Sequence, residues 1–591
     1  MHLNLLEWAA SMSSDLRDNV TPADVIAECI VPTTKSVFFL GSFESRVTLF
    51  AQQIRALNLA DALVEQAIVR PTGRVAIIGG GVAGMTLAAA LAVAAPTLTV
   101  IDLYDRKEEL LHLQRGSRDR YLHPHLYDWP RPNSTADDAG LPILNWHAAP
   151  ANEVAGAIEE GFIEIRRHHT IINLRLGLDV ERLLPAPLGP GCRVFIRNLP
   201  KDRSEFYDAV ILTIGFGYES FLSESNPSYW SASLLGGPII GPGNDHVILI
   251  SGNGDGGLVD FMMAAYNHVG HRQIFDFITH YPGLDSVEAL LLMIEERAWT
   301  ADGSIDLFDE YRRLIAPELP PHMLLDIEQR LRPGVRIVFH TREQHLFRRD
   351  TAVLNRFGAF LAILADENSG RNRIRLTVGK EFIDAPPVNG EVRIVGEPAF
   401  TPRMRFLRLG AEAKKNLAPF HVLAEEFQAR PKATEPRFRP ATPALTASAI
   451  GRFSGLIPRA ETAPQVADTR TTPAVTGHRN VNLRAQHEAD GRFSWSGDLA
   501  LDAIGAAWND DIMALVVTFE APPSEAGPLV AALARLCGHA GRCEFRCRDR
   551  RRWEDAMKGF SGRALPGPDV SWKFDIVGGP ISPGVIAGAP L

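Results

Sequence analysis

The sequence predicts an α/β protein with two nucleotide-binding domains, a helical segment before them and a small α+β domain after them. Three observations lead to this prediction. Two glycine-rich turns each lie between an apolar strand and a helix. The first 73 residues contain apolar positions at helical spacing, and residues 426–480 form a Pro- and Thr-rich interruption before a further strand and helix.

Length and composition limit the class of protein. The chain has 591 residues, of which 46% are hydrophobic and 22% are charged, the proportions of a globular protein of several domains rather than of a disordered chain. Its formal net charge is −9, so no overall positive charge favours nucleic acid. Five cysteines are too few for a disulfide scaffold and suit a reducing compartment, so we expect a cytoplasmic protein.

Residues 75–101 carry no charged side chain before the acid at 102 and are long enough to cross a membrane. The stretch contains a cluster of four glycines and then Pro96, and the spacing of its apolar residues changes on either side of them. We therefore expect a strand, a turn, a helix and a second strand of a soluble domain. The N-terminal residues also lack the basic start of a secretory signal.

The patterns along the chain divide it into five segments. Changes in periodicity and composition set their boundaries. They are a helical segment at 1–73, a first nucleotide-binding domain at 74–250, a second one with a helical insertion at 251–425, a linker at 426–480 and a C-terminal domain at 481–591, in which a strand is expected at 513–521 and a helix at 528–540.

The most specific motif is GGGVAG, which directly follows the apolar strand at 74–78. In a G-x-G-x-x-G turn the first glycine makes the tight bend, the second lets the backbone approach a pyrophosphate, and the third lets the helix pack against the strand. The N-terminus of the helix then offers N–H groups and a positive dipole to phosphate. The predicted cofactor-binding residues of this motif are Gly79, Gly80, Gly81, Val82, Ala83 and Gly84.

An acidic residue follows at the distance that a ribose site requires. Asp102 lies 18 residues after Gly84, directly after the expected second strand. A carboxylate there accepts hydrogen bonds from both ribose hydroxyls and repels a 2′-phosphate. We therefore expect the adenosine half of FAD or NAD rather than of NADP, with Asp102 and the nearby Arg106 among its binding residues. The alternative is a degenerate domain that keeps the packing glycines and binds nothing.

A second landmark favours FAD over NAD. The apolar strand at 209–212 ends in Thr213-Ile214-Gly215, and a strand-rich stretch at 192–198 precedes it. This arrangement resembles the Ala-Thr-Gly signature and the β-meander of flavoproteins with two dinucleotide-binding domains, the glutathione reductase-like superfamily, although Ile214 stands where a Thr is more usual. The resemblance implies two Rossmann-type domains, with FAD in the first and with Thr213 and Gly215 among the residues that bind it.

The segment GNGDGG repeats the glycine pattern between a strand and a helix. In the resembled superfamily an NAD(P)H-binding domain is inserted at about this place, and hydride transfer to flavin requires the two sites to face one another. The resemblance thus implies NAD(P)H at Gly252, Gly254 and Gly257. An alternative stays open, in which Asp255 holds the flavin ribityl chain as the Gly-Asp pair of many FAD domains does.

Helices follow the second glycine turn, so the second domain departs from the simplest pattern. The strand expected at 335–341 comes later and ends directly before Arg342, an arrangement that faintly resembles the flavin-dependent N-hydroxylating monooxygenases. The resemblance implies that the helices are an insertion and that the planar guanidinium of Arg342 reaches a 2′-phosphate. Arg348 and Arg349 are further candidates, and ordinary solvated arginines are the alternative.

The most unusual segment is RYLHPHLYDWPRP, residues 120–132. His123, His125, Tyr127 and Asp128 lie close together in it and carry the groups that transfer protons near a reduced flavin. We name these four as candidate catalytic residues. The alternative is a rigid loop in which each of these side chains has a structural partner.

No metal site is expected. The chain contains no C-x-x-C pair, which excludes the dithiol relay of disulfide reductases. The spacing of Cys537, His539, Cys543 and Cys547 matches no common zinc motif, and the basic stretch at 546–560 is more typical of a solvated helix face than of a nucleic-acid site.

Taken together, these motifs predict an FAD-dependent NAD(P)H oxidoreductase or monooxygenase-like enzyme that acts on a small-molecule substrate. The flavin itself carries the redox chemistry, so the protein has to bind and orient it. We expect no membrane partner and no nucleic-acid partner. The alternative is a non-catalytic dinucleotide-binding sensor that acts on a protein partner through its C-terminal domain.

Overall fold

A computed structural model of the chain describes residues 20–456 apart from short gaps, and beyond residue 456 it describes five strands. The chain forms two compact units, residues 1–462 and 463–591, and each is described by itself. The gaps within the first unit are residues 45–46, 188, 198–203, 216–218, 220–225, 232–234, 236–245, 268–269, 301–304, 385–389, 411–412 and 431–442.

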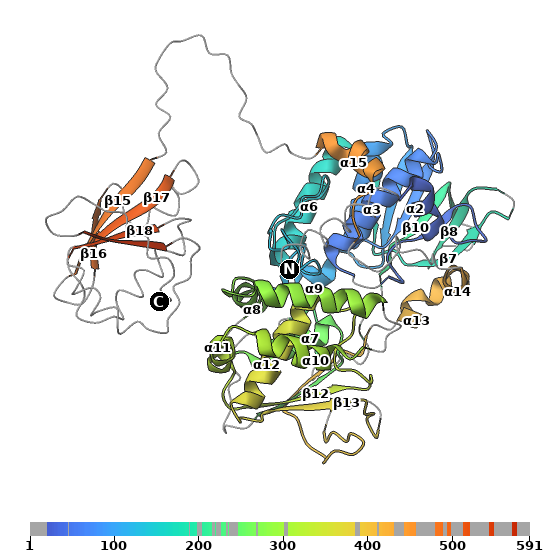
Figure 1. The fold of residues 1–591 in the computed structure, drawn as a ribbon. Helices are drawn as coiled ribbons and strands as arrows, with labels where there is room; N and C mark the ends of the chain where they lie inside the picture. The colour runs from blue at the N-terminus through green and yellow to red at the C-terminus, as the bar shows by residue number, and fades with distance from the viewer. Residues whose placement is uncertain are drawn as a thin grey trace, which may run out of the picture. The chain divides into compact units, whose positions relative to one another are not determined.

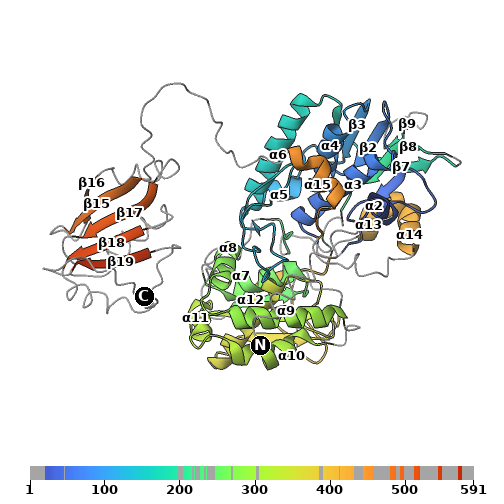
Figure 2. The same ribbon diagram turned by 45° about the horizontal axis from the view of Figure 1, so that its top comes forward.

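The first unit is built around two parallel sheets, each of which belongs to one Rossmann-type domain (Figures 1 and 2). The sheet of the first domain has five parallel strands in the order β1-β10-β2-β3-β6. Its strands are β1 (Val37–Phe39), β2 (Arg74–Ile78), β3 (Val100–Asp105), β6 (Ile172–Leu176) and β10 (Ala209–Leu212).

Helix α4 (Val82–Ala94) connects β2 to β3 and forms the crossover that the first glycine motif predicts. Almost all its side chains are small or apolar, and they are buried in the protein, so α4 is a helix of the hydrophobic core and not a membrane span. No helix among the described residues is long and apolar enough to cross a membrane.

The segment before residue 74 contributes to the first domain directly. Strand β1 pairs with β10 at the edge of the sheet. Helix α3 (Leu49–Glu65) packs along α4, and its apolar side chains join the same hydrophobic core. Helix α2 (Pro22–Cys29) precedes both and begins with a capping box between Thr21 and Asp24.

A three-stranded antiparallel sheet covers one face of the first parallel sheet. It consists of β7 (Val180–Pro185), β8 (Cys192–Ile196) and β9 (Ser204–Tyr207). Buried side chains of these strands share a core with side chains of β1, β2 and β10. The β-meander that the resemblance implies is therefore present.

The second domain has a four-stranded parallel sheet in the order β13-β12-β11-β14. Helices α7 (Asp255–Ala265) and α12 (Val353–Asn368) cover one face and build a large core there (Figure 1). Phe382, Val392, Ile394 and Phe400 pack on the opposite face. The strands are β11 (His246–Ser251), β12 (Val335–Thr341), β13 (Ile374–Val378) and β14 (Met404–Leu407).

The helical segment of this domain corresponds to the insertion that the sequence predicts. It lies between α7 and β12, and the strand predicted at 335–341 has the same bounds as β12. Its helices are α8 (His271–Thr279), α9 (Asp285–Thr300), α10 (Leu307–Glu310) and α11 (Met323–Arg330), with a π-helical turn at Tyr311–Ile315 and a 3-10 turn at Ala316–Glu318.

The bridging segment, residues 106–150, connects β3 to α6 (Ala151–His168) and contributes to both cores. Tyr121 and Trp129 pack in the core of the second domain, whereas Leu141 and Trp146 pack in the core of the first. Its short elements are α5 (His112–Arg115), β4 (Tyr121–Leu122) and β5 (Ala149–Pro150).

After β14 the chain returns to the first domain. Helix α15 (Ala447–Phe453) packs on α3, where Phe453 is fully buried and Arg452 pairs with Asp61 and Glu65. Part of the expected linker is thus helical. The remaining elements here are α13 (Ala413–Leu417), α14 (His421–Ala429) and 3-10 turns at Ala418–Phe420 and Ser454–Leu456.

The second unit contains one sheet in the order β16-β15-β17-β18-β19. The pair β15–β16 is antiparallel and the other pairs are parallel. The strand expected at 513–521 corresponds to β17, and the helix expected at 528–540 lies outside the described residues. The strands are β15 (Arg479–His487), β16 (Phe493–Gly497), β17 (Ile512–Phe519), β18 (Cys543–Arg548) and β19 (Val570–Asp575).

Candidate functional site

The first glycine loop connects β2 to α4, and two of its glycines are required by the backbone. Gly79 has a φ of +121°, and a Cβ there would lie 2.5 Å from the carbonyl oxygen of Thr213. A Cβ at Gly84 would lie 2.0 Å from the carbonyl oxygen of Gly79. These contacts explain the first and third glycines as conditions for the turn and for the close approach of helix and strand.

Gly81 differs from them because open space lies beside it. No atom comes within 4 Å of a Cβ built there. Gly81 is also the N-cap residue of α4, and no side chain caps the helix at that position. The first N–H groups of α4, which belong to Val82 and Ala83, therefore face a position where a phosphate would complete their hydrogen bonds. The loop fits a pyrophosphate.

Thr213 holds this loop in place from the end of β10. Its hydroxyl donates hydrogen bonds to the carbonyl oxygens of Ile78, at 3.1 Å, and Gly79, at 2.8 Å. Gly215 follows with a φ of +63°. The Thr-x-Gly pair therefore borders the glycine loop at the carboxyl ends of the strands, where open α/β sheets bind their ligands.

Asp102 does not lie where a ribose would reach it. It is the third residue of β3, and its side chain has no exposed area. Its Oδ2 atom accepts a hydrogen bond of 2.7 Å from Tyr207, and its Oδ1 atom accepts hydrogen bonds from Asn173 and Arg175 at 3.1 Å and 3.2 Å. The carboxylate is thus already satisfied inside the sheet, and the expectation that it binds the ribose needs correction.

Asp105 occupies the position expected for the ribose acid. It is the last residue of β3 and is partly exposed. Its Oδ2 atom accepts the N–H of Gly80 at 2.6 Å, and its Oδ1 atom accepts the N–H of Lys107 at 2.7 Å. A carboxylate offers about four acceptor sites, so Asp105 can accept two further hydrogen bonds from ribose hydroxyls. Sequence reasoning missed this residue because it counted from Gly84 and ended the strand early.

Arg106 and Asn416 lie next to Asp105 at the same edge of the sheet. Arg106 is exposed and donates a hydrogen bond of 3.1 Å to the side-chain oxygen of Asn416. The amide nitrogen of Asn416 donates to the carbonyl oxygens of Ile214, at 3.0 Å, and Gly215, at 3.3 Å. Helix α13 thereby connects the end of β3 with the end of β10. No sequence pattern singles out Asn416.

The second glycine loop, between β11 and α7, repeats the geometry of the first. Gly252 has a φ of +115°, and a Cβ there would lie 2.0 Å from the carbonyl oxygen of Arg408. A Cβ at Gly257 would lie 1.9 Å from the carbonyl oxygen of Gly252, and no atom lies within 4 Å of one at Gly254. The backbone of this loop therefore also fits a pyrophosphate.

Asp255 distinguishes the second loop. Its Oδ1 atom accepts hydrogen bonds from the N–H of Ala352, at 2.9 Å, and from the side chain of Asn355, at 2.7 Å. Its Oδ2 atom accepts a short hydrogen bond from the hydroxyl of Tyr127. Burial raises the pKa of Asp255 above its usual range. These partners belong to α12 and the bridging segment, and they do not favour a role for Asp255 in holding a flavin ribityl chain.

Arg342 follows the end of β12 and is exposed. Its place in the second domain matches that of Arg106 in the first, because each arginine directly follows the strand that comes after a glycine loop. The two further candidates are engaged elsewhere. Arg348 pairs with Asp350, and the guanidinium of Arg349 lies over the ring of Trp299 and donates to a backbone oxygen.

Two of the four candidate catalytic residues are histidines with very different surroundings. His123 is 5% exposed, and the centre of its ring lies 4.5 Å from the centre of the Phe275 ring. Its Nδ1 atom accepts a hydrogen bond from the backbone N–H of His125. Burial lowers the pKa of His123 to about 4. A hydrogen bond with Asp128 raises the pKa of His125, whose Nε2 atom also contacts the carbonyl oxygen of Asp138.

Tyr127, the third candidate, is bound to Asp255, and Asp128, the fourth, interacts with His125 at 3.7 Å. The structure thus brings these four residues into internal contacts, of which only that of Tyr127 reaches a glycine loop. The contacts favour the alternative in which this segment is a rigid loop whose side chains have structural partners, although the Nε2 atom of the buried His123 makes no hydrogen bond with any residue that the structure describes.

A buried charged cluster fixes the bridging segment to the second domain. Asp260 lies on α7 and forms two ion pairs. Its Oδ1 atom lies 2.7 Å from a guanidinium nitrogen of Arg120, and its Oδ2 atom lies 2.7 Å from the Nε atom of Arg408. All three side chains are almost fully buried. The guanidinium of Arg120 also lies 4.0 Å from the ring centre of Tyr229. Sequence reasoning missed this cluster, because its members come from three distant parts of the chain.

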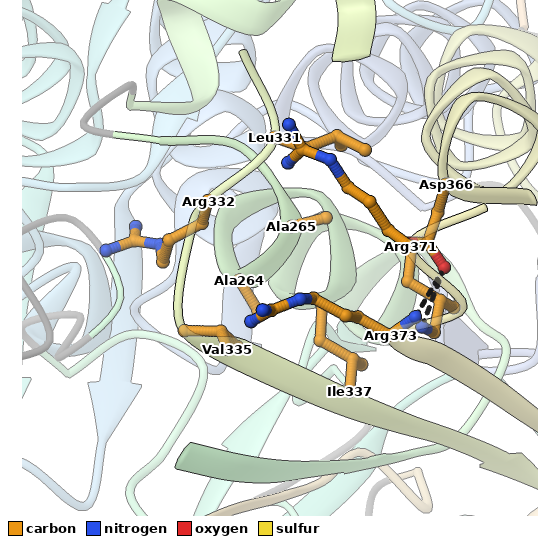
Figure 3. A pocket seen from close by; sticks show the side chains of 10 residues that line it. Ala264, Ala265, Leu331, Arg332, Val335, Ile337, Asp366, Arg371 and Arg373 are labelled. Atoms are coloured by element: carbon orange, nitrogen blue, oxygen red, sulfur yellow. Dashed lines mark hydrogen bonds between the residues drawn. The ribbon is translucent and has the colours of Figure 1, made fainter. Parts of the chain in front are cut away.

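A small cavity lies at the other end of the second sheet (Figure 3). Its volume of about 10 Å³ has room for one water molecule. The carboxylate of Asp366 accepts the backbone N–H groups of Arg373 and Ile374 beside it. The cavity is lined by the start of β12 and β13 and the end of α7, so it is separate from the glycine loops.

The described residues contain no group of three His, Cys, Asp or Glu side chains that would hold a metal ion. Cys543 and Cys547 lie on β18, and Cys537 and His539 are outside the described residues.

Comparison with protein families gives a match to the C-terminal part of the chain. Residues 489–574 match the model of CTD2, described as C-terminal domain 2 of the ABC-three component (ABC-3C) systems. The match covers most of the second unit and none of the first. A comparison with curated protein sequences found no match.

Several solved structures are similar to part of this chain. Thioredoxin reductase of T. acidophilum is 10% identical, with a TM-score of 0.26 over 56% of this chain and 75% of that one. OTEMO in complex with FAD and NADP is 11% identical, with a TM-score of 0.31 over 59% and 74%. The ornithine N-hydroxylase KtzI of Kutzneria sp. 744, with reduced FAD, NADP+ and L-ornithine, is 10% identical, with a TM-score of 0.29 over 59% and 83%.

These proteins belong to the class of flavoprotein that the glycine motifs resemble. Their similarity to this chain is weak. The assignment of two Rossmann-type domains rests instead on the order of the parallel strands and on the geometry of the two glycine loops.

Proposed function

We propose that the chain is a flavoprotein that binds FAD in its first domain, takes electrons from NAD(P)H and acts together with partner proteins through its second unit. One observation carries the proposal. The first glycine loop leaves open space at Gly81, presents the uncapped N-terminus of α4 and lies beside the carboxylate of Asp105.

Different residues at this site would bind different parts of FAD. The N–H groups of Val82 and Ala83 would bind the pyrophosphate, and Asp105 would accept the ribose hydroxyls. Arg106 and Asn416, which join the ends of two strands, would border the adenosine half. FAD, when bound, supplies the chemistry of accepting a hydride and passing on electrons.

The second glycine loop supports NAD(P)H as the reductant, because its backbone repeats the geometry of the first loop at the three glycines of the G-x-G-x-x-G motif. Arg342 stands exposed after the neighbouring strand, where a planar guanidinium would bind a 2′-phosphate. This position favours NADPH over NADH.

The second unit supports a partner protein. Its similarity is to a C-terminal domain of ABC-three component systems, whose description names an assembly of several components. We therefore propose that the second unit binds another component of such a system and that the flavoprotein unit supplies a redox activity or a redox signal to it.

A second candidate function is a dinucleotide sensor without catalysis. It is favoured by the internal contacts of His123, His125, Tyr127 and Asp128, which leave no free proton donor among the expected catalytic residues. In this case the bound dinucleotide would change how the second unit interacts with its partner.

The absorption spectrum of the purified full-length chain tests the proposal. We expect flavin bands that bleach when NADPH is added without oxygen, and release of FAD on denaturation. Protein without flavin bands that gains thermal stability from a dinucleotide would support the sensor instead. Protein that neither carries flavin nor responds to FAD, NADH or NADPH would contradict both.

A further inference from the structure

We propose that Asp255 weakens the binding of a dinucleotide at the second glycine loop, because its carboxylate supplies the negative charge that a pyrophosphate would bring. The inference rests on the proposed function of this loop as an NAD(P)H site. It assigns to Asp255 the role of a specificity-determining residue, with Tyr127 as the residue that positions it.

The two loops of the chain provide an internal comparison. Their glycines correspond in pairs: Gly79 with Gly252, Gly81 with Gly254, and Gly84 with Gly257, and each pair has the same backbone surroundings. The residue after the open glycine is Val82 in the first loop and Asp255 in the second. This position is thus neutral in the loop for which we propose FAD, and charged in the loop for which we propose NAD(P)H.

The charge lies at the N-terminal ends of two helices. Asp255 is the first residue of α7, and its Oδ1 atom accepts the N–H of Ala352, the N-cap residue of α12, whose own side chain makes no capping hydrogen bond. Both helix dipoles are positive at this point. The carboxylate therefore already accepts one N–H group at the start of α12 and lies at the positive ends of both helix dipoles, which also attract a phosphate.

Nearby arginines do not cancel this charge. Arg348 and Arg356 both interact with Asp255 electrostatically, but each is paired with another acid, Asp350 in the first case and Glu295 in the second. Each of these pairs is neutral, so neither arginine cancels the charge of Asp255. A pyrophosphate at Gly254 would be repelled by it.

Tyr127 fixes the carboxylate in this position. It belongs to the bridging segment, 128 residues earlier in the chain, and its hydroxyl donates to the Oδ2 atom of Asp255. Asn355 donates to Oδ1 from the other side. With both oxygens held, the carboxylate keeps its position unless the contact with Tyr127 is broken.

Two neutral substitutions test the proposal on the full-length chain. Asp255→Asn keeps the shape of the side chain: its oxygen still accepts from Ala352, and the Tyr127 hydroxyl can accept from its amide. Asp255→Ser is a second neutral residue that suits a helix N-terminus. Glu160→Gln on the exposed surface of α6 is the matched control, because it changes the net charge by the same amount.

The measurement is the dissociation constant of NADPH by calorimetric titration, with the FAD content of each sample determined alongside. We expect the Asn and Ser variants to bind NADPH about tenfold more tightly than wild type, or better, and Glu160→Gln to match wild type. Equal affinity in wild type and both neutral variants would overturn the proposal.

Failure of NADPH to bind any of these proteins would overturn it as well, since the loop would then have no ligand whose affinity Asp255 could lower. That result stays distinct from failure of the flavoprotein assignment, because the FAD content of the same samples reports on the first loop alone.

Discussion

Substitution of the glycines of the first loop separates the binding of FAD from the folding of the domain. At Gly84 a Cβ would lie 2.0 Å from a backbone oxygen, well inside the 3.4 Å at which ordinary contact begins. The loop and α4 must move apart to accommodate Gly84→Ala, and overpacking of this kind costs about 1–3 kcal/mol. We expect this variant to lose both stability and FAD.

Gly81→Ala has a different expected result. Its Cβ meets no protein atom within 4 Å, and its backbone is extended, with a φ of −78°. The loss of stability should be about 1 kcal/mol or less, the usual cost of alanine at an N-cap. The methyl group would, however, occupy the space through which a pyrophosphate approaches, so we expect the variant to fold and to retain little FAD.

Gly156→Ala serves as the control for both. Gly156 lies inside α6, where a Cβ also meets no atom within 4 Å, and alanine there should stabilise the helix by about 0.5–1 kcal/mol. The assay compares the thermal midpoint with the ratio of flavin to protein absorbance for each variant. Wild-type FAD content in Gly81→Ala would refute the assignment of the first loop as the pyrophosphate site.

Two further predictions concern the first domain and the buried histidines. We expect Asp105→Asn to lower FAD content at a nearly unchanged thermal midpoint. We expect Asp102→Asn to lower the thermal midpoint at nearly unchanged FAD content, because that carboxylate is buried among Tyr207, Asn173 and Arg175. The opposite pattern would restore Asp102 as the ribose acid. Burial lowers the pKa of His123 and His271 from 6.5 to about 4, so protonation favours the unfolded state. The stability present above pH 6.5 should decrease as the pH falls toward 4, by about 3 kcal/mol for each ring. Thermal midpoints measured from pH 7 to pH 4.5 check this. His123→Phe should reduce the change of the midpoint with pH by about half. A wild-type midpoint that does not change with pH would contradict the prediction.

The glycine loops could be predicted from the sequence because their determinants are local. The bend at Gly79, the open face at Gly81 and the packing of Gly84 all arise within six consecutive residues. The second loop has the same spacing and adopts the same backbone. Alternation between apolar strands and helices then predicted the parallel sheets around them.

The ribose acid could not be assigned correctly by counting. The distance from Gly84 to the end of β3 depends on the length of the connection after α4, and the strand continues past Asp102 to Asp105. A signal was present, because apolar residues stand on both sides of Asp102 in the sequence VIDLYD. A charged residue within such a run is more typical of a paired group inside a sheet than of the end of a strand.

Contacts between distant segments lay beyond the sequence altogether. Tyr127 and Asp255 are 128 residues apart, and neither periodicity nor spacing relates them. The same holds for Arg120, Asp260 and Arg408, whose buried charges are tolerated only because they meet in three dimensions. The sequence marked residues 120–132 as unusual, but only the fold shows that they connect two domains.

This connection gives the two glycine loops a physical link. The bridging segment begins directly after Asp105, beside the first loop, and reaches Asp255 in the second through Tyr127. A ligand that changes the position of this segment would therefore change how firmly the carboxylate of Asp255 is held. Coupling of this kind is reciprocal: if FAD at the first loop favours release of Asp255, then NAD(P)H at the second loop must favour retention of FAD to the same extent.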